Sequence, residues 1–144
     1  MLHAIVACSL VLLLPSAAIA QRAAWTMLSD GEGTELPYPG DIFTERTERD
    51  TPGRVLTSAD GRARLHVFVL PNDRHETPRQ FIRRVIVDDR RNLSYERVTD
   101  RFFVFSAPEE DRILYRRCNF ARDRRIHCVD LRYPRREKRA WTLS

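Results

Sequence analysis

Two cysteines are the residues of this sequence whose spacing has the clearest chemical consequence. Cys118 and Cys128 flank the polar segment 121–124, which separates two strand-like runs. A hairpin that turns about Asp123 would place the two cysteines directly opposite each other, at a Cα separation that a disulfide can bridge. We therefore predict a structural disulfide between them. Two alternatives stay open, namely a redox-active pair and a metal site that includes His127.

The other groups that could do acid–base or nucleophilic chemistry are scattered along the chain. His66 falls in a strand-like run and His75 in the loop that follows, and no spacing connects them to a nucleophile. The acidic groups at 88–89 and 109–111 fall at an expected helix end and an expected turn. Phosphate-loop and zinc-protease motifs are absent from the sequence. We expect no catalytic residue, no metal and no cofactor; the alternative is a small secreted hydrolase, or hydrolase inhibitor, with a site near His66 and His75.

Arginine dominates the basic residues and is unevenly distributed. Of the 25 basic residues, 24 are arginine and one is Lys138. Residues 21–60 hold four arginines and eight acidic residues, a net charge of −4, whereas residues 61–144 hold 21 basic and 12 acidic residues, a net charge of +9. This asymmetry predicts an anion-binding surface on the last hairpin and the tail. The predicted anion-binding residues are Arg116, Arg117, Arg122, Arg124, Arg125, Arg132, Arg135 and Arg136.

The expected partner of this surface is an anionic envelope polymer or an acidic protein. A competing interpretation is a compositional bias toward arginine, whose long side chains cover sheet surface and pair with the acidic N-terminal segment.

Residues 1–20 have the layout of a secretory signal peptide. An apolar run is centred on 10–14, and residues 18–20 supply the small side chains that a signal peptidase recognises. We expect cleavage after Ala20, a single domain of residues 21–144, and a periplasmic or secreted location. An N-terminal membrane anchor is the alternative, but the apolar run is shorter than a bilayer span.

Export changes the number of cysteines in the mature protein and the classes of partner that the protein can meet. Cys8 leaves with the signal, so an even pair of cysteines remains in an oxidising compartment, which favours the disulfide. The same compartment disfavours nucleic acid as a partner. Residues 21–144 contain no apolar run long enough for a bilayer, so we expect no stable membrane insertion after cleavage, and we expect a monomer.

The hydrophobic pattern of residues 53–144 predicts an α+β domain. Two alternating runs, 55–59 and 62–70, are separated by Asp60-Gly61, a type I′ turn signal. A capping box at Thr77–Gln80 begins a helix expected over 77–90, with an apolar stripe that needs a sheet to cover. We expect a single antiparallel sheet of about six or seven strands, packed by that helix and by a short C-terminal helix or tail. The four strands of the meander predicted after the helix are 93–99, 102–107, 112–120 and 125–133.

The N-terminal part of the domain gives weaker signals. Residues 24–28 are a candidate short strand. Residues 35–40 can form at most a short edge strand, because two prolines remove donors from the ladder. Residues 41–52 are expected to be a polar loop that Ile42 and Phe43 anchor.

Four segments together resemble a known type of protein. "LPYPGDIF" (36–43), "GRVLTSADGRARLHVFVLP" (53–71), "TPRQF" (77–81) and "YERVTDRFFVFS" (95–106) are similar to small exported proteins of alphaproteobacteria that have no assigned activity. The layout also resembles PsbP-type domains, in which helices sandwich an antiparallel sheet. This resemblance implies a fold and carries no catalytic signature.

These features predict an exported, non-enzymatic binding or accessory module of the cell envelope. In this hypothesis the arginine-rich hairpin and tail contact an anionic partner. The hydrolase or hydrolase inhibitor is the competing class, and a structural protein with no small ligand is a third.

Overall fold

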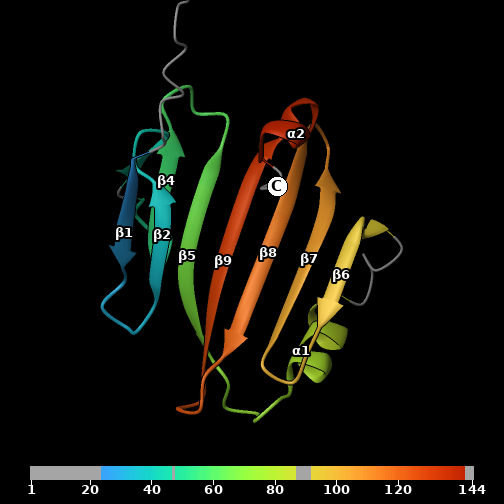
Figure 1. The fold of residues 1–144 in the computed structure, drawn as a ribbon. Coiled ribbons are helices and arrows are strands. Elements are labelled where there is room, and N and C mark those ends of the chain that lie inside the picture. The colour runs from blue at the N-terminus through green and yellow to red at the C-terminus, as the bar shows by residue number, and fades with distance from the viewer. Residues whose placement is uncertain (1–23, 47, 87–91, 142–144) are drawn as a thin grey trace, which may run out of the picture.

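The fold is dominated by antiparallel strands (Figure 1). The computed structural model describes residues 24–46, 48–86 and 92–141; the predicted signal peptide lies outside them. Seven strands form one sheet in the order β3-β4-β5-β9-β8-β7-β6, and β1 pairs with β2 in a separate sheet. The strands are β1 (Trp25–Ser29), β2 (Glu35–Pro39), β3 (Phe43–Arg46), β4 (Arg54–Ser58), β5 (Arg64–Pro71), β6 (Tyr95–Val98), β7 (Phe102–Glu109), β8 (Arg112–Phe120) and β9 (Arg125–Pro134). The helices are α1 (Pro78–Val85), the 3-10 turn η2 (Arg135–Glu137) and α2 (Lys138–Trp141).

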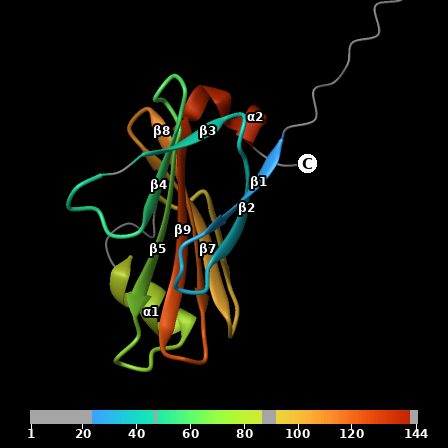
Figure 2. The same ribbon diagram turned by 90° about the vertical axis from the view of Figure 1, so that its left-hand side faces the viewer.

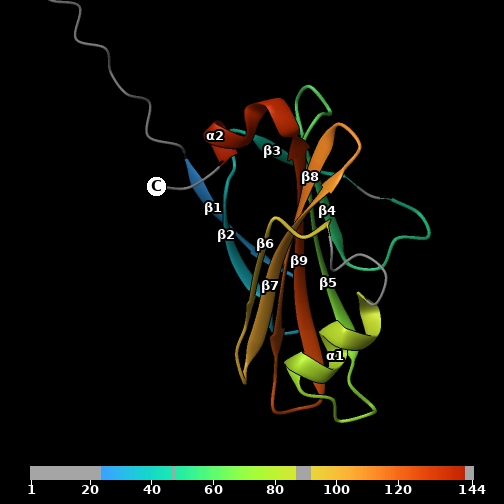
Figure 3. The same cartoon turned by 90° about the vertical axis from the view of Figure 1, so that its right-hand side faces the viewer.

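The expectation of a single sheet is wrong. The β1–β2 ribbon lies across one face of the seven-stranded sheet, and α1 lies on the opposite face, as Figures 2 and 3 show from the two sides. Pro37 and Pro39 cannot donate backbone hydrogen bonds, so β2 is poorly suited to extend the larger ladder. The ribbon instead buries one apolar side against the face of the sheet.

The four-strand meander predicted after the helix is confirmed. β6, β7, β8 and β9 pair in chain order, and every pair is antiparallel. The predicted hairpin of residues 55–70 is present as β4 and β5, and β5 joins the meander by pairing with β9.

The loop between β4 and β5 differs from the predicted type I′ turn. The backbone N–H of Ser58 donates to the carbonyl of Ala63, so the loop is wider than a two-residue turn. The Asp60 carboxylate stabilises this loop by accepting hydrogen bonds from the Ser58 hydroxyl and the Arg62 amide.

The segment expected to be a polar loop contains a strand. Phe43–Arg46 forms β3 at the edge of the sheet beside β4. Phe43 is buried and packs against Trp141 of α2, with ring centroids 5.7 Å apart, whereas Ile42 is exposed and does not anchor the segment. Phe43 is therefore the buried anchor of this short edge strand, which β4 also holds through the ladder and through the ion pair between Arg54 and Glu45.

The start of α1 follows the prediction, but its end does not. Thr77 accepts a hydrogen bond from the Gln80 amide, and the Gln80 side chain accepts one from the Thr77 amide, with Pro78 in the first turn. The helix ends at Val85, because Ile86 has left helical dihedral angles and turned into the core. The predicted run to residue 90 is therefore too long; residues 87–91 themselves lie outside the described residues.

The C-terminal helix packs at one end of the sheet rather than on the face that α1 covers (Figure 2). Its Trp141 ring stacks on Tyr133 of β9, with centroids 5.8 Å apart. None of the helices in the described residues is long and apolar enough to cross a membrane.

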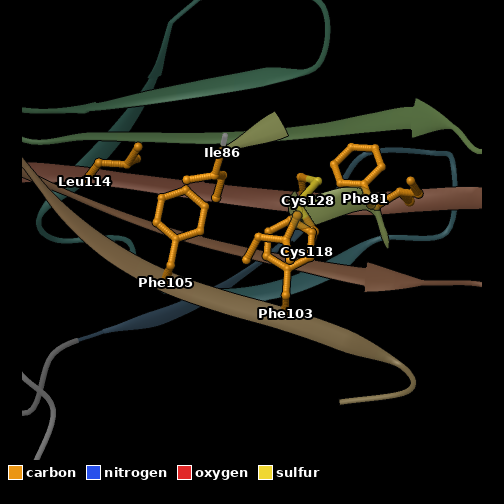
Figure 4. Close-up of a cluster of buried hydrophobic side chains, with 9 residues drawn as sticks. Phe81, Ile86, Phe103, Phe105, Leu114, Cys118 and Cys128 are labelled. Carbon is orange, nitrogen blue, oxygen red and sulfur yellow. A yellow bond between two sulfur atoms is a disulfide. The ribbon is translucent and has the colours of Figure 1, made fainter. Parts of the chain in front are cut away.

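The predicted disulfide is present and lies in the core under α1. Cys118 and Cys128 are register partners in β8 and β9, with their Cα atoms 4.1 Å apart. Figure 4 shows the bond among aromatic side chains from α1 and β7, including Phe81 and Phe103. Both cysteines are almost fully buried, which is the environment of a structural disulfide rather than a reactive one.

We expect reduction of this disulfide to lower the free energy of unfolding by about 3 kcal/mol, because the bond closes a short loop in the unfolded chain. Urea denaturation with and without reductant measures the difference. A digest under non-reducing conditions should also yield the Cys118 and Cys128 peptides linked to each other. Two free thiols, or identical denaturation curves, would contradict the structural role.

The β1–β2 ribbon covers part of the other face. Leu28 of β1 and Leu36 and Tyr38 of β2 pack onto residues of the seven-stranded sheet such as Leu56 and Val67. This cluster is separate from the one under α1, so the sheet has an apolar core on each side.

A small hydrogen-bonded group fastens the turn of the ribbon to β9. Thr34 Oγ1 lies 2.7 Å from His127 Nδ1, and Asp30 Oδ1 accepts hydrogen bonds from the backbone N–H groups of Glu32 and Thr34 at 2.8 and 2.9 Å. Burial raises the pKa of Asp30, but the hydrogen bonds from Thr34 and Glu32 outweigh it, so the pKa lies below its ordinary value of 3.8. Folding therefore favours the ionised carboxylate.

The depressed pKa of Asp30 makes its contribution to stability depend on pH. Because the folded pKa of Asp30 is depressed, its stabilising contribution is present above the unfolded pKa and is lost as the pH falls through the folded pKa. We expect Asp30→Asn to lower the free energy of unfolding by about 1 kcal/mol near neutral pH. The difference in stability between the variant and the unmodified protein should become smaller below the ordinary pKa of an aspartate. Urea denaturation across the acid range measures this. Asp41→Asn, at an exposed carboxylate, is the control, and a gap independent of pH would refute the role of ionisation.

Candidate functional site

The eight arginines predicted to bind anions do not form one patch. Neighbouring residues of a strand point to opposite faces, and β9 alone is ten residues long, so its two ends are about 30 Å apart. Arg116 and Arg132 lie on the α1 side and Arg117 on the β1–β2 side. Arg122, Arg124 and Arg125 lie at the β8–β9 turn, and Arg135 and Arg136 follow the far end of β9.

Arg116 and Arg132 hold a buried carboxylate. Arg116 Nε and Nη2 donate to Asp130 Oδ1 and Oδ2 at 2.5 and 2.6 Å. Arg132 Nη1 donates to Asp130 Oδ2 at 3.3 Å, and its Nε donates to Glu109 at 2.8 Å. Asp130 is only 2% exposed, so it depends on these donors for its solvation. We therefore assign both arginines a structural role.

We expect Asp130→Asn to lower the free energy of unfolding by about 3 kcal/mol, because it leaves two partly buried guanidinium groups without their shared carboxylate. Thermal or urea denaturation measures the loss. Asp123→Asn is the matched control, because it removes the same charge from an exposed ion pair and should therefore cost much less stability. Equal losses in the two variants would show that the Asp130 pair contributes no more than a surface pair.

Most of the other predicted arginines lie at the two ends of the sheet. Arg125 pairs with Asp123, with Nε and Nη2 at 2.7 and 2.5 Å from Oδ2. This pairing and its hydrogen bonds lower the pKa of Asp123. Arg122 and Arg124 are exposed in the same turn. At the other end Arg135 donates to the carbonyl of Glu110, and Arg136 is exposed.

The structure does not bring together the residues of the alternative hydrolase site. His66 lies within β5, where its ring stacks on Phe68 and its Nε2 lies 2.8 Å from the carbonyl oxygen of Pro52. His75 is exposed in the loop beyond the end of β5, several residues along the chain. Among the described residues, no three His, Cys, Asp or Glu side chains are grouped so that they could hold a metal ion.

Among the described residues, no helix or strand covers a large part of the β1–β2 side of the sheet. The ribbon lies over the β4 side, and β6, β7 and β8 are bare in Figure 1. We call the side chains that β6–β9 present on this side the open face; none of them is acidic. In register rows from the α2 end, they are Pro108, Ile113 and Tyr133; Tyr95, Ser106, Tyr115 and Leu131; Arg97, Val104, Arg117 and Val129; and Phe102, Asn119 and His127. The ribbon reaches the last row, where Thr34 contacts His127, and neighbouring side chains bury Val104, Ile113 and Tyr133 within the face.

A groove of about 440 Å³ lies over the first two rows of the open face. β8 and β9 supply its floor, while β6 and α2 supply its sides. Burial raises the pKa of Tyr133, and burial also raises that of Tyr115, although the nearby Arg117 partly offsets the latter effect. Both phenols therefore stay neutral over the physiological range. The apolar and aromatic lining consists of Tyr95, Ile113, Tyr115, Leu131, Tyr133 and Trp141.

Two arginines adjoin the groove in the third row. The guanidinium carbons of Arg97 and Arg117 lie 5.7 and 4.3 Å from the centroid of the Phe102 ring. Arg117 also donates to the side-chain oxygen of Asn119 at 3.2 Å. Neither guanidinium forms an ion pair with a carboxylate of the described residues. This pair of cations is held in place by an aromatic ring rather than by an opposite charge.

The sequence prediction included Arg117 but missed Arg97, Tyr95, Tyr115 and Trp141. The sequence did contain a pattern that indicates Tyr95, Arg97 and Tyr115, because a tyrosine is followed two residues later by an arginine at 95 and 97 and again at 115 and 117. In two strands of one sheet this spacing places each pair on one face. Trp141 gave no such signal, since its position depends on where α2 packs.

No family model matches this chain, and no curated protein matches it.

Proposed function

We propose that this chain is an exported, non-enzymatic binding or accessory module that recognises an anionic partner on its open face. The observation that carries the proposal is the pair formed by Arg97 and Arg117 on a surface without acidic residues. The partner class is an anionic envelope polymer or an acidic protein. The arginines of the α1 side contrast with this pair, because Asp130 and Glu109 already neutralise them.

The position of the two guanidinium groups over an aromatic ring suits anion recognition. A guanidinium group that is held against a ring rather than by a carboxylate keeps most of its N–H groups available to acceptors. Because the ring does not neutralise the positive charge, an arriving carboxylate, sulfate or phosphate group gains charge-assisted hydrogen bonds without displacing an internal ion pair.

Export is supported by the sequence of residues 1–20 and by the disulfide. The apolar run and the small residues before Ala20 have the pattern of a cleaved signal. A buried disulfide is typical of proteins that fold in an oxidising compartment. In this proposal the module meets its partner in the periplasm or outside the cell.

We expect Arg97→Ser combined with Arg117→Ser to weaken binding to dextran sulfate about tenfold, since two exposed cations contribute about 1.4 kcal/mol together. Calorimetry at several salt concentrations measures the affinity, and neutral dextran should not bind.

Arg122→Ser combined with Arg124→Ser is the matched control, because it removes the same charge from the β8–β9 turn. We expect this control to change the affinity less than the open-face variant does. Equal weakening in the two variants would mean that net charge alone drives binding, and that result would contradict a site on the open face.

A further inference from the structure

The groove and the arginine pair are two parts of one continuous surface. Tyr95, Ser106 and Tyr115 form one register row, and Arg97 and Arg117 lie in the next row of the same strands. Successive rows on one face of a sheet are about 7 Å apart. An apolar hollow therefore ends within one row of two cations.

The chemistry of the two parts differs in a way that selects a ligand. The groove is lined mainly by carbon, with rings from Tyr133 and Trp141 stacked at 5.8 Å along one side. Its volume falls within the range of sites that hold small organic molecules. The adjoining row offers the guanidinium N–H groups of Arg97 and Arg117. A ligand that satisfies both parts has an apolar body and an anionic group at one end.

We propose that the open face binds a monomeric anionic amphiphile, with its apolar chain in the groove and its anionic group at Arg97 and Arg117. This inference rests on the anion site of the proposed function and goes beyond it, because it assigns that site a further class of ligand: a small anion with an attached apolar chain. Neutral amphiphiles leave the two guanidinium groups without an acceptor, and purely polar anions leave the groove in contact with water. Charge complementarity and the buried apolar area therefore favour the same class of ligand.

The two tryptophans of the chain allow a direct test. Trp141 lines the groove, whereas Trp25 is exposed on β1. In the full chain with Trp25→Phe, the fluorescence of Trp141 alone reports on the groove. We expect octanoate to shift this emission to shorter wavelength in a saturable manner. 1-Octanol has a chain of the same length without the charge, and we expect it to bind at least about tenfold more weakly. Equal affinities for octanoate and octanol would overturn the inference.

Variants separate this inference from the proposed function. Arg97→Ser with Arg117→Ser should weaken octanoate binding about tenfold, while Arg122→Ser with Arg124→Ser should leave it unchanged. Ser106→Trp should block the groove and abolish octanoate binding while it keeps both arginines. If dextran sulfate binds through the arginine pair but octanoate does not bind, this inference fails and the proposed function stands. If neither ligand depends on the pair, both fail.

A membrane source of the same chemistry is a separate outcome. Vesicles of anionic phospholipid present their chains inside a bilayer, where a groove of this size cannot surround them. We expect octanoate to bind in the absence of vesicles and vesicles not to compete for the site. Binding of anionic vesicles without binding of free octanoate would overturn the proposal of a monomeric ligand.

Circular dichroism and an unchanged denaturation midpoint confirm that each variant is folded.

Discussion

A seven-stranded sheet has two broad faces, and the part of the chain that the structure describes has too little additional structure to cover them. The available cover is one helix of eight residues on one side and a two-stranded ribbon on the other. Long arginine side chains complete the cover, since Arg84, Arg97, Arg116 and Arg117 each lie over a phenylalanine ring. The arrangement of charge, the position of the groove and the candidate function all depend on this shortage.

Different kinds of side chain cover the two faces of the seven-stranded sheet. On the α1 side, Asp130 and Glu109 accept hydrogen bonds from the arginines, so this side contains a largely neutral network above the disulfide and the aromatic core. On the other side the ribbon supplies apolar residues over β4 and β5, and the open face beyond it contains cations but no acidic residue. One face is therefore internally satisfied, whereas the other has cationic groups that can accept a partner. This asymmetry is not visible in the net charge of +5.

Local patterns in the sequence predicted the elements better than their assembly. The hairpin about Asp123 specifies the β8–β9 register, and this register alone places Cys118 opposite Cys128 and Tyr115 beside Leu131. The capping box at Thr77 similarly specifies the start of α1. The separate ribbon and strand β3 were missed, because proline and charge made these segments look like an edge strand and a loop. The open face was missed for a related reason: which half of a sheet stays bare depends on where the ribbon packs, and that contact joins residues far apart in sequence.

Binding of a partner on the open face can be tested in one NMR titration, because each face carries matched reporters. Ile113 and Trp141 line the groove, whereas Ile126 lies under α1 and Trp25 lies on the exposed side of β1. In protein with labelled isoleucine methyl groups and tryptophan indoles, octanoate should shift the Ile113 and Trp141 signals along one binding curve and leave the Ile126 and Trp25 signals in place. Shifts of Ile126 equal to those of Ile113, or no shift of Trp141 at saturation, would contradict this account.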